Sequence, residues 1–245
     1  MTRLFGLIGY PLSHSFSKKY FTEKFAREGI TGCAYELFPL TSINELEDLL
    51  RANPQLQGLN VTIPYKQQVL PYLHSREGIP EGMGACNCIR ISQGKLYGFN
   101  TDTIGFQKSF SPFLQPWHQK ALVLGNGGAA LAVVHVLKKL GIDYKVVSRQ
   151  LHEGSALTYA DLTPEIIQEH TVIINTTPLG TYPNIHECPP IPYDHITPKH
   201  FLYDLIYNPE KTLFLQKGSE HGAQIHNGYD MLVIQAEESW KIWSG

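Results

Sequence analysis

Cysteine is scarce in this sequence, and the arrangement of the few cysteines argues against two kinds of architecture. The chain has 4 cysteines in 245 residues and no C-x-x-C pair. A disulfide framework or a zinc site would need more cysteines or a different spacing, so we expect neither, and we expect a reducing compartment, the cytoplasm. The 11 histidines show no metal-ligand spacing, and we predict no metal site.

An excess of charge of one sign and long hydrophobic runs are also missing. The formal net charge is −2, which gives no basic footprint for nucleic acid. No apolar stretch approaches the length of a membrane-spanning helix, and the apolar segment 4–8 is broken by Pro11 too soon for a signal peptide. We therefore expect no membrane association. Hydrophobic residues still make up 42%, enough for a sizeable core in one or two domains.

Strand-like runs alternate with helical patterns in two series along the chain. The strands of the first series are Leu4–Gly9, Ala34–Pro39 and Gly58–Ile63, and those of the second begin at Ala121 and continue at Thr171–Asn175 and Phe201–Leu205. Such alternation predicts parallel strands joined by right-handed crossovers. Between the two series, residues 86–99 read as a hairpin that turns at Gln93-Gly94. The fold class predicted is therefore α/β, with two domains and a cleft between them.

The clearest motif follows the first strand of the second series. Residues 125–130 read Gly-Asn-Gly-Gly-Ala-Ala, which fits G-x-G-x-x-A, between an apolar strand and a helical pattern that ends at Gly141. In a Rossmann domain the first glycine makes a tight turn, the second lets backbone approach a pyrophosphate, and the helix N-terminus faces its charge. The motif predicts a dinucleotide site that includes Gly125, Gly127, Gly128 and Ala129.

The end of the next strand indicates which dinucleotide binds. NAD sites usually place an acidic residue there to bond the ribose 2′-hydroxyl. Here the strand 144–147 is followed by Ser148-Arg149-Gln150, and Asp143 lies at the opposite end of the strand. Arginine can pair with a 2′-phosphate through its planar fork and can stack on adenine. The alternative is a solvated surface arginine; the sequence favours NADP.

Polar residues also mark the end of the first series. In the segment Asn-Val-Thr-Ile-Pro-Tyr-Lys, residues 60–66, Asn60 and Thr62 alternate with apolar residues and should share one face of a strand. Pro64 suits the first turn of a helix that would include Lys66. A lysine at the positive end of a helix dipole needs a carboxylate, a ligand or solvent to compensate it.

Asp102 is the candidate carboxylate, because it lies where the first series gives way to the second. Its alternative role is to cap a helix that begins near Thr103. The stretch LIGYPLSHSFSKKYF, residues 7–21, places hydroxyl groups after a buried strand. This loop could hold a small polar ligand, or Ser13, Ser15 or Ser17 could simply cap the following helix.

Seven motifs in order carry a resemblance to a known family over essentially the whole chain. They are PLSHSFS at 11–17, NVTIPYK at 60–66, GACN at 84–87, NTD at 100–102, GNGGAA at 125–130, NTTPLG at 175–180 and NGYDMLVIQA at 227–236. The sequence resembles the NADP-dependent shikimate and quinate dehydrogenase family. The resemblance implies a substrate-binding domain at 1–101, onto which a C-terminal helix at 226–245 packs back, and an NADP-binding Rossmann domain at 102–225.

The resemblance also implies roles for individual residues. It implies that Lys66 is the catalytic lysine and that Asp102 is paired with it. The residues implied to bind substrate are Ser15 and Ser17 for the carboxylate, with Asn60, Thr62, Asn87 and Gln235 for the ring hydroxyls and Tyr207 lining the site. The residues implied to bind the cofactor are Gly125, Gly127, Gly128, Ala129, Ser148, Arg149 and, near the nicotinamide, Met231. Ser13 is not expected to bind.

The reaction implied is reversible hydride transfer between NADPH and 3-dehydroshikimate, which gives shikimate for aromatic amino-acid biosynthesis. Two alternatives stay open: quinate or another cyclic polyol acid as substrate, or a non-catalytic NADP-binding sensor. Lys66 and Asp102 argue against the sensor, because a sensor needs no proton-transfer pair. We expect a small-molecule substrate and either a monomer or a homodimer.

Overall fold

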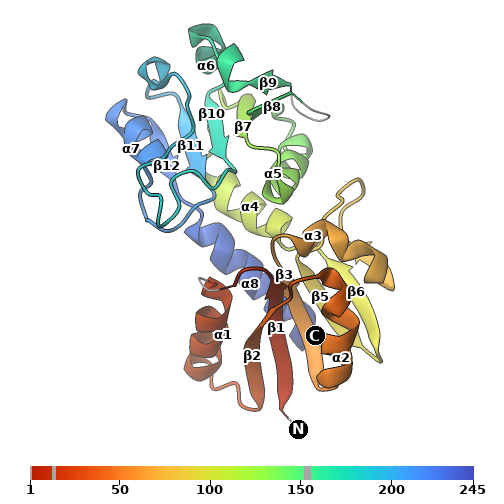
Figure 1. Ribbon diagram of the computed structural model, residues 1–245. Coiled ribbons are helices and arrows are strands. Elements are labelled where there is room, and N and C mark those ends of the chain that lie inside the picture. The colour runs from red at the N-terminus through yellow and green to blue at the C-terminus, as the bar shows by residue number, and fades with distance from the viewer. Residues whose placement is uncertain (1, 13–14, 152–155) are drawn as a thin grey trace. The chain divides into compact units, whose positions relative to one another are not determined.

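The computed structural model describes residues 2–12, 15–151 and 156–245. It divides the chain into two compact units. Unit 1 comprises Met1–Thr101 with Ala236–Gly245, and unit 2 comprises Asp102–Gln235. Each unit is built on a six-stranded sheet with helices against it, so both units are α/β (Figure 1).

Unit 1 combines parallel strands with one antiparallel hairpin. Its elements are β1 (Arg3–Gly9), α1 (Phe16–Arg27), β2 (Cys33–Pro39), α2 (Leu46–Ala52), β3 (Leu56–Val61), α3 (Tyr65–Gln68), β4 (Ser75–Gly78), β5 (Cys88–Ser92) and β6 (Lys95–Phe99), with 3-10 turns at Ile43–Glu45 and Leu70–Tyr72. The sheet order is β2-β1-β3-β5-β6-β4. β1 pairs in parallel with β2 and β3, whereas β5 is antiparallel to β3 and β6.

The hairpin between β5 and β6 confirms the predicted turn. Gln93 has φ 50° and Gly94 has φ 71°, so both central residues lie in the left-handed region. A two-residue turn of this kind matches the twist of antiparallel strands, and glycine reaches that region without a Cβ clash. The hairpin is short, and it carries the chain from Asn87, before β5, to Thr101, after β6.

The core of unit 1 lies on both faces of its sheet. Leu4, Ile8 and Leu59 belong to one buried cluster, and Phe5 and Leu7 belong to the other. Successive residues of β1 alternate between the two clusters, as side chains of a strand must. The strand is therefore apolar along nearly its whole length because both of its faces are covered.

Unit 2 has the strand order of a Rossmann domain. Its elements are α4 (Asp102–Phe110), β7 (Lys120–Leu124), α5 (Gly128–Lys139), β8 (Asp143–Ser148), β9 (Leu157–Thr158), α6 (Pro164–Glu169), β10 (Val172–Asn175), β11 (Phe201–Asp204), α7 (Leu213–Glu220), β12 (Gln224–His226) and the start of α8 (Tyr229–Ser244), with 3-10 turns at Ser111–Phe113, Tyr159–Asp161 and Tyr193–His195. The sheet order is β12-β11-β10-β7-β8-β9, and each neighbouring pair is parallel. The order reverses between β7 and β10, which is where such folds bind ligands, beyond the carboxyl ends of the strands.

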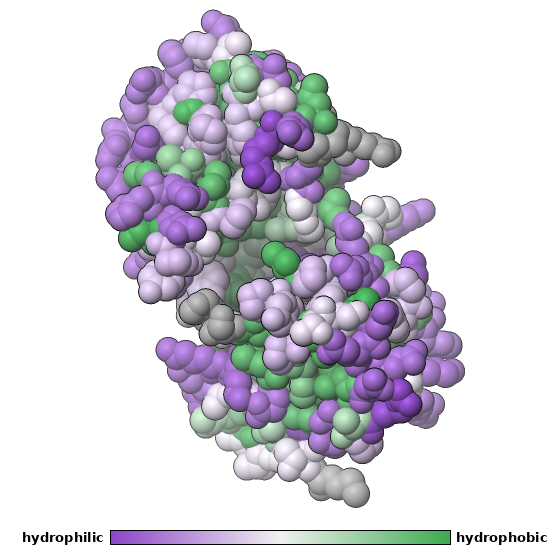
Figure 2. All heavy atoms as spheres, in the orientation of Figure 1, coloured by the Kyte–Doolittle hydropathy of each residue, from purple (hydrophilic) through white to green (hydrophobic). Residues whose placement is uncertain are grey.

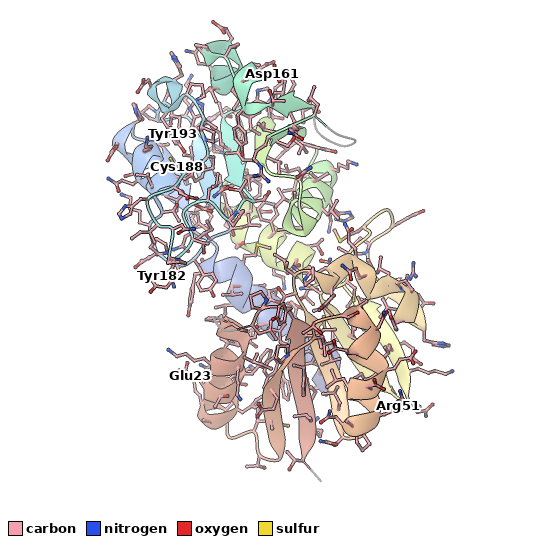
Figure 3. The ribbon with its side chains drawn as sticks, in the orientation of Figure 1. Glu23, Arg51, Asp161, Tyr182, Cys188 and Tyr193 are labelled. Carbon is pink, nitrogen blue, oxygen red and sulfur yellow. The ribbon has the colours of Figure 1, made fainter. Side chains whose placement is uncertain are left out.

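The long connection between β10 and β11 is packed against the second sheet. The Tyr193 ring belongs to a buried cluster with Leu202 and Phe214, and its hydroxyl donates to the Pro189 carbonyl oxygen at 2.8 Å. Cys188 packs against the same cluster (Figure 3). This cysteine therefore serves as a small apolar residue, which is a common role for a free thiol.

The last helix differs from the expectation that the whole segment from 226 packs on the first domain. His226 ends strand β12 of the second sheet, and α8 begins only at Tyr229. Met231 is buried in the core of unit 2, while Ala236 and Trp243 are buried in the core of unit 1. One helix thus contributes its first turns to one core and its later turns to the other, because it presents apolar residues along its whole length.

Hydrophilic side chains are spread over the visible face of both units (Figure 2). Among the described residues, no helix combines the length and the apolar character needed to cross a membrane.

Candidate functional site

A tight turn joins β7 to α5 in unit 2. Gly125 has φ +104°, and a Cβ at this position would lie 2.8 Å from Thr176 Oγ1 and 3.0 Å from Thr177 Cγ2. The conformation and the close approach both require glycine. The Gly125 N–H donates to the Val147 carbonyl oxygen at 2.8 Å, which ties the turn to β8.

The N-terminus of α5 directly follows this turn and is open. Gly127 occupies the N-cap position and makes no side-chain capping bond, and a Cβ there would meet nothing within 4 Å. The first N–H groups of a helix have no partner within the helix, and they carry the positive end of its dipole. Gly128 and Ala129 form the first turn, so these residues fit a pyrophosphate group.

The end of β8 lies beside the same turn, through the pairing of Leu124 with Val147. A cavity of about 360 Å³ is lined by Asn126, Ser148, Arg149 and Gln150. Ser148 is buried, whereas the Arg149 guanidinium is exposed. The cavity thus joins Asn126, the residue after Gly125, to the predicted 2′-phosphate residues. The lining residues that the structure describes include one cation and no carboxylate.

A buried polar network holds the loops beyond β10 and β11. Asn175 Nδ2 donates to Asp204 Oδ1 at 3.0 Å, and Asn175 Oδ1 accepts from the Thr177 hydroxyl at 2.7 Å. Asp204 Oδ2 accepts from the Thr212 hydroxyl at 2.6 Å. Burial raises the pKa of Asp204 to about 7, although its hydrogen bonds act in the opposite direction. The sequence predicted no role for this network. The signal that could have indicated it is that two apolar strands each end in a polar residue, Asn175 and Asp204.

Tyr207 follows β11 on the loop that this network supports. Its ring is half-buried, and burial raises the pKa of its hydroxyl. The loop is held to the residues before α8 by Gly228, whose N–H donates to the Ile206 carbonyl oxygen at 3.0 Å. A Cβ at Gly228 would lie 2.0 Å from the Leu205 carbonyl oxygen, so only glycine fits.

Three further predicted residues of unit 2 lie on helices. Met231 is buried near the start of α8. Gln235, one turn further, is half-buried, and its Nε2 donates to the Leu232 carbonyl oxygen at 2.9 Å. Asp102 is the first residue of α4 and is buried, so its carboxylate lies at the favourable, positive end of that helix.

In unit 1, the serine-rich loop leads into α1. Ser15 is the N-cap of α1, and its hydroxyl oxygen accepts from the Ser17 N–H at 3.3 Å. The Ser17 hydroxyl interacts with the Tyr35 hydroxyl. Both serines are half-buried. Ser15 therefore caps α1, as the alternative interpretation predicted. The cap uses only the hydroxyl oxygen as an acceptor, so the hydroxyl proton of Ser15 is not used by it. Ser13 lies outside the described residues.

Thr62 and Lys66 follow β3. The chain leaves the strand after Val61, and Ile63 is 73% exposed. The Thr62 carbonyl oxygen accepts from the Tyr65 N–H at 2.9 Å, and the Lys66 carbonyl oxygen accepts from the Cys86 N–H at 2.7 Å. The helix at Lys66 is only four residues long and begins after Pro64, not at it. Lys66 is held next to the segment that contains Asn87.

Asn60 and Asn87 are buried, and a hydrogen bond joins them directly. Asn60 Nδ2 donates to the Asn87 carbonyl oxygen at 3.3 Å, and Asn60 Oδ1 accepts from the Tyr35 hydroxyl at 2.9 Å. Unit 1 therefore brings Ser17, Asn60 and Asn87 into one polar cluster.

Lys66 belongs to unit 1 and Asp102 to unit 2. No group of three or more metal-ligating side chains occurs in the described part of the chain.

Comparison with known proteins gives matches along the chain. Residues 7–89 match the family described as shikimate dehydrogenase substrate binding domain. A protein from Clostridium beijerinckii named shikimate dehydrogenase (NADP(+)) is 39% identical over 251 residues, which cover 98% of this chain and 91% of the relative.

Solved structures give the same result. A chorismate mutase/shikimate 5-dehydrogenase fusion protein from Clostridium acetobutylicum has a TM-score of 0.88 and 37% identity, covering 100% of this chain and 91% of that chain. Shikimate 5-dehydrogenase from Thermus thermophilus, solved in complex with NADP(H) and shikimate, has a TM-score of 0.87 and 27% identity, covering 100% and 94%. With a glycine turn and an open helix N-terminus in one unit, a hydroxyl and amide cluster in the other, and full-length similarity to these enzymes, the chain belongs to the shikimate dehydrogenase family.

Proposed function

We propose that this protein catalyses the reversible, NADPH-dependent reduction of 3-dehydroshikimate to shikimate, in the cytoplasm. The observation that carries the proposal is the open N-terminus of α5 after the left-handed Gly125, beside a cavity whose described lining residues include Arg149 and no acidic residue. This arrangement suits NADP, and the relatives matched along the whole chain are named as NADP-dependent shikimate dehydrogenases.

The residues of unit 2 fit the cofactor group by group. The first N–H groups of α5, at Gly128 and Ala129, would bond the pyrophosphate. Arg149, with Ser148 beside it, would pair with the 2′-phosphate, and Met231 would lie at the nicotinamide. When bound, NADPH supplies the hydride; the protein supplies position and electrostatics.

The substrate would be held through its carboxylate and its ring hydroxyls. Ser15 and Ser17 offer hydroxyl protons at the start of α1, where the helix dipole also favours an anion. Thr62, Asn87 and Gln235 would bond the ring hydroxyls, with Tyr207 lining the site. Asn60 would contribute at most an acceptor, because both of its amide protons are donated within unit 1.

Lys66 would act as the general acid of the reduction. As the carbonyl carbon of 3-dehydroshikimate gains the hydride, its oxygen gains negative charge, and a proton from the Lys66 ammonium neutralises that oxygen. Asp102 would orient the same oxygen and the ammonium group. In the reverse direction Lys66 accepts the proton.

A steady-state assay of NADPH formation from shikimate tests the proposal. We expect turnover with shikimate and NADP, with slower turnover of quinate. Faster turnover of quinate would favour the alternative substrate, and binding of NADP with no turnover of either acid would favour a sensor. Analytical ultracentrifugation of the same sample would distinguish a monomer from a homodimer, the two states that we propose.

A further inference from the structure

A buried chain of hydrogen bonds in unit 1 passes through a residue that the proposed site does not include, Ser239 of α8. Asn60 Nδ2 donates to Ser239 Oγ at 2.9 Å, and Ser239 Oγ lies 3.3 Å from Thr101 Oγ1. Ser239 and Thr101 are both 0% exposed. Solvent therefore does not compete for these bonds, and each group depends on its protein partners.

Thr101 holds the amide of Asn87 at both of its polar atoms. Asn87 Nδ2 donates to Thr101 Oγ1 at 3.0 Å, and the Thr101 N–H donates to Asn87 Oδ1 at 2.6 Å. These two bonds fix which way the amide of Asn87 faces, because rotating it would leave buried polar atoms unsatisfied. The position of the Thr101 hydroxyl thus decides the position of a proposed substrate-binding amide.

Asn60 continues the chain in the other direction. Its Oδ1 accepts from the Tyr35 hydroxyl at 2.9 Å, and the Tyr35 hydroxyl interacts with Ser17. The chain of contacts therefore runs Ser17–Tyr35–Asn60–Ser239–Thr101–Asn87. Ser239 lies at its centre, between the proposed carboxylate-binding end and the proposed hydroxyl-binding end.

The helix that carries Ser239 is itself fixed to α1. Lys24, a buried residue of α1, donates to Glu237 Oε2 at 2.8 Å and to Glu28 Oε1 at 2.8 Å. Glu237 also accepts from the Tyr20 hydroxyl. The helix that carries Ser239 is therefore tied to α1 two residues before this buried hydroxyl.

We propose that Ser239 is a positioning residue for the substrate site, which acts through Thr101 on the amide of Asn87 and through Asn60 and Tyr35 on Ser17. The inference rests on the proposed function. Ser239 needs no contact with substrate to do this, since its hydroxyl orders the side chains that make contact. Its loss should weaken substrate binding and leave cofactor binding intact, because the residues proposed to bind NADP lie in unit 2.

The experiment compares Ser239→Ala and Thr101→Val with the wild type. We expect each to raise KM for shikimate about threefold to tenfold, the equivalent of one neutral hydrogen bond, with KM for NADP unchanged. The double variant should raise KM less than the product of the two single effects, because both changes break one chain. Thr101→Ser, which keeps the hydroxyl, should restore KM.

Ser244→Ala is the matched control: Ser244 lies on the same helix, is exposed, and its hydroxyl donates to the Trp240 carbonyl oxygen at 2.8 Å. The side-chain amide resonance of Asn87 should shift in Ser239→Ala and not in Ser244→Ala. An unchanged KM for shikimate and an unmoved Asn87 resonance would overturn the inference, as would failure of both Ser239→Ala and Thr101→Val to fold. Absence of wild-type turnover would instead overturn the proposed function.

Discussion

The side-chain amide of Asn175 donates to the carboxyl group of Asp204 at 3.0 Å, and it joins the ends of two neighbouring strands of the second sheet. Asp204 is fully buried and also accepts from the Ile206 N–H at 3.0 Å. Both loops that follow these strands therefore depend on one acidic side chain. The loops include Thr177, beside the Gly125 turn, and Tyr207.

This carboxyl group should make the stability of the protein depend on pH. Burial raises its pKa to about 7, above the ordinary value of 3.8 that applies when the chain is unfolded. Between these two values the folded state keeps a proton that the unfolded state loses, so stability falls as pH rises from about 4 to about 7. Asp204→Asn, which imitates the protonated form, should flatten this part of the curve.

Thermal unfolding at several pH values between about 4 and 8 checks this prediction. Asp161→Asn is the control: Asp161 is an exposed carboxylate (Figure 3), and hydrogen bonds from Thr158 lower its pKa. Asp161 is therefore ionised in both states through most of this range, and its replacement should leave the slope unchanged. Parallel curves for wild type and Asp204→Asn would contradict the prediction.

Ser15 and Ser17 should respond differently to alanine, because only Ser15 caps α1. Both substitutions remove a hydroxyl group that we propose as a donor to the substrate carboxylate, and we expect each to raise KM for shikimate by the equivalent of about 1.5–3 kcal/mol. Ser15→Ala should also destabilise the protein by about 0.5–2 kcal/mol, the usual cost of losing an N-cap.

Ser15→Asp separates the two roles of Ser15. Aspartate restores the cap, so thermal stability should return, but its charge repels a substrate carboxylate, so KM should stay high. Denaturation and steady-state kinetics on the same preparations give both quantities. If KM were unchanged in both alanine variants, these serines would not be the carboxylate site.

Local sequence signals predicted much of the fold. Strand β1 reads as a continuous apolar run because both of its faces are buried, and the hairpin turn was marked by Gly94. The end of α5 was marked by Gly141, which has φ 70°. In unit 2 the glycine motif and Arg149 lie around one turn and one cavity, as a linear motif that spans a strand, a turn and a helix can predict.

Features that depend on long-range packing were not predicted. Strand β3 ends at Val61, two residues before the expected end at Ile63, because the chain turns there toward α3. Strand β12 is only three residues long, and its backbone is extended because it pairs in parallel with β11. Ser239 reads as one more polar residue of a helix; only the tertiary structure brings it to Asn60, which lies 179 positions away in the sequence.

Lys66→Ala should remove nearly all turnover while shikimate still binds. General acid–base catalysis contributes about 10²–10⁴-fold, and we expect kcat to fall by that factor. Asp102→Asn should give a similar loss, because it removes the charge that we propose to orient the ammonium group and the substrate oxygen. Lys95→Ala, on the exposed hairpin of unit 1, is the control and should behave as the wild type.

Stopped-flow measurement of kcat and titration of shikimate into each variant separate chemistry from binding. Retention of near-normal kcat by Lys66→Ala, with an unchanged pH profile, would mean that another group transfers the proton. Weakened shikimate binding with a near-normal kcat would assign Lys66 to binding alone.

Arg149 should decide the choice of cofactor. Among the described residues, it is the one cation that lines the cavity at the end of β8, and none of the described lining residues is acidic. A charge-assisted contact with the 2′-phosphate favours NADP, but solvent and salt weaken it because the guanidinium is exposed.

We therefore expect a moderate preference for NADP over NAD that decreases as salt rises. Arg149→Ala should raise KM for NADP and leave KM for NAD nearly unchanged, whereas Lys145→Ala, within the strand β8 that precedes Arg149 and outside this cavity, should change neither. Kinetics with both cofactors at low and high salt make the comparison. Equal losses with NADP and NAD would mean that Arg149 stacks on the adenine, and a wild-type preference for NAD would show that the 2′-phosphate is not what this arginine recognises.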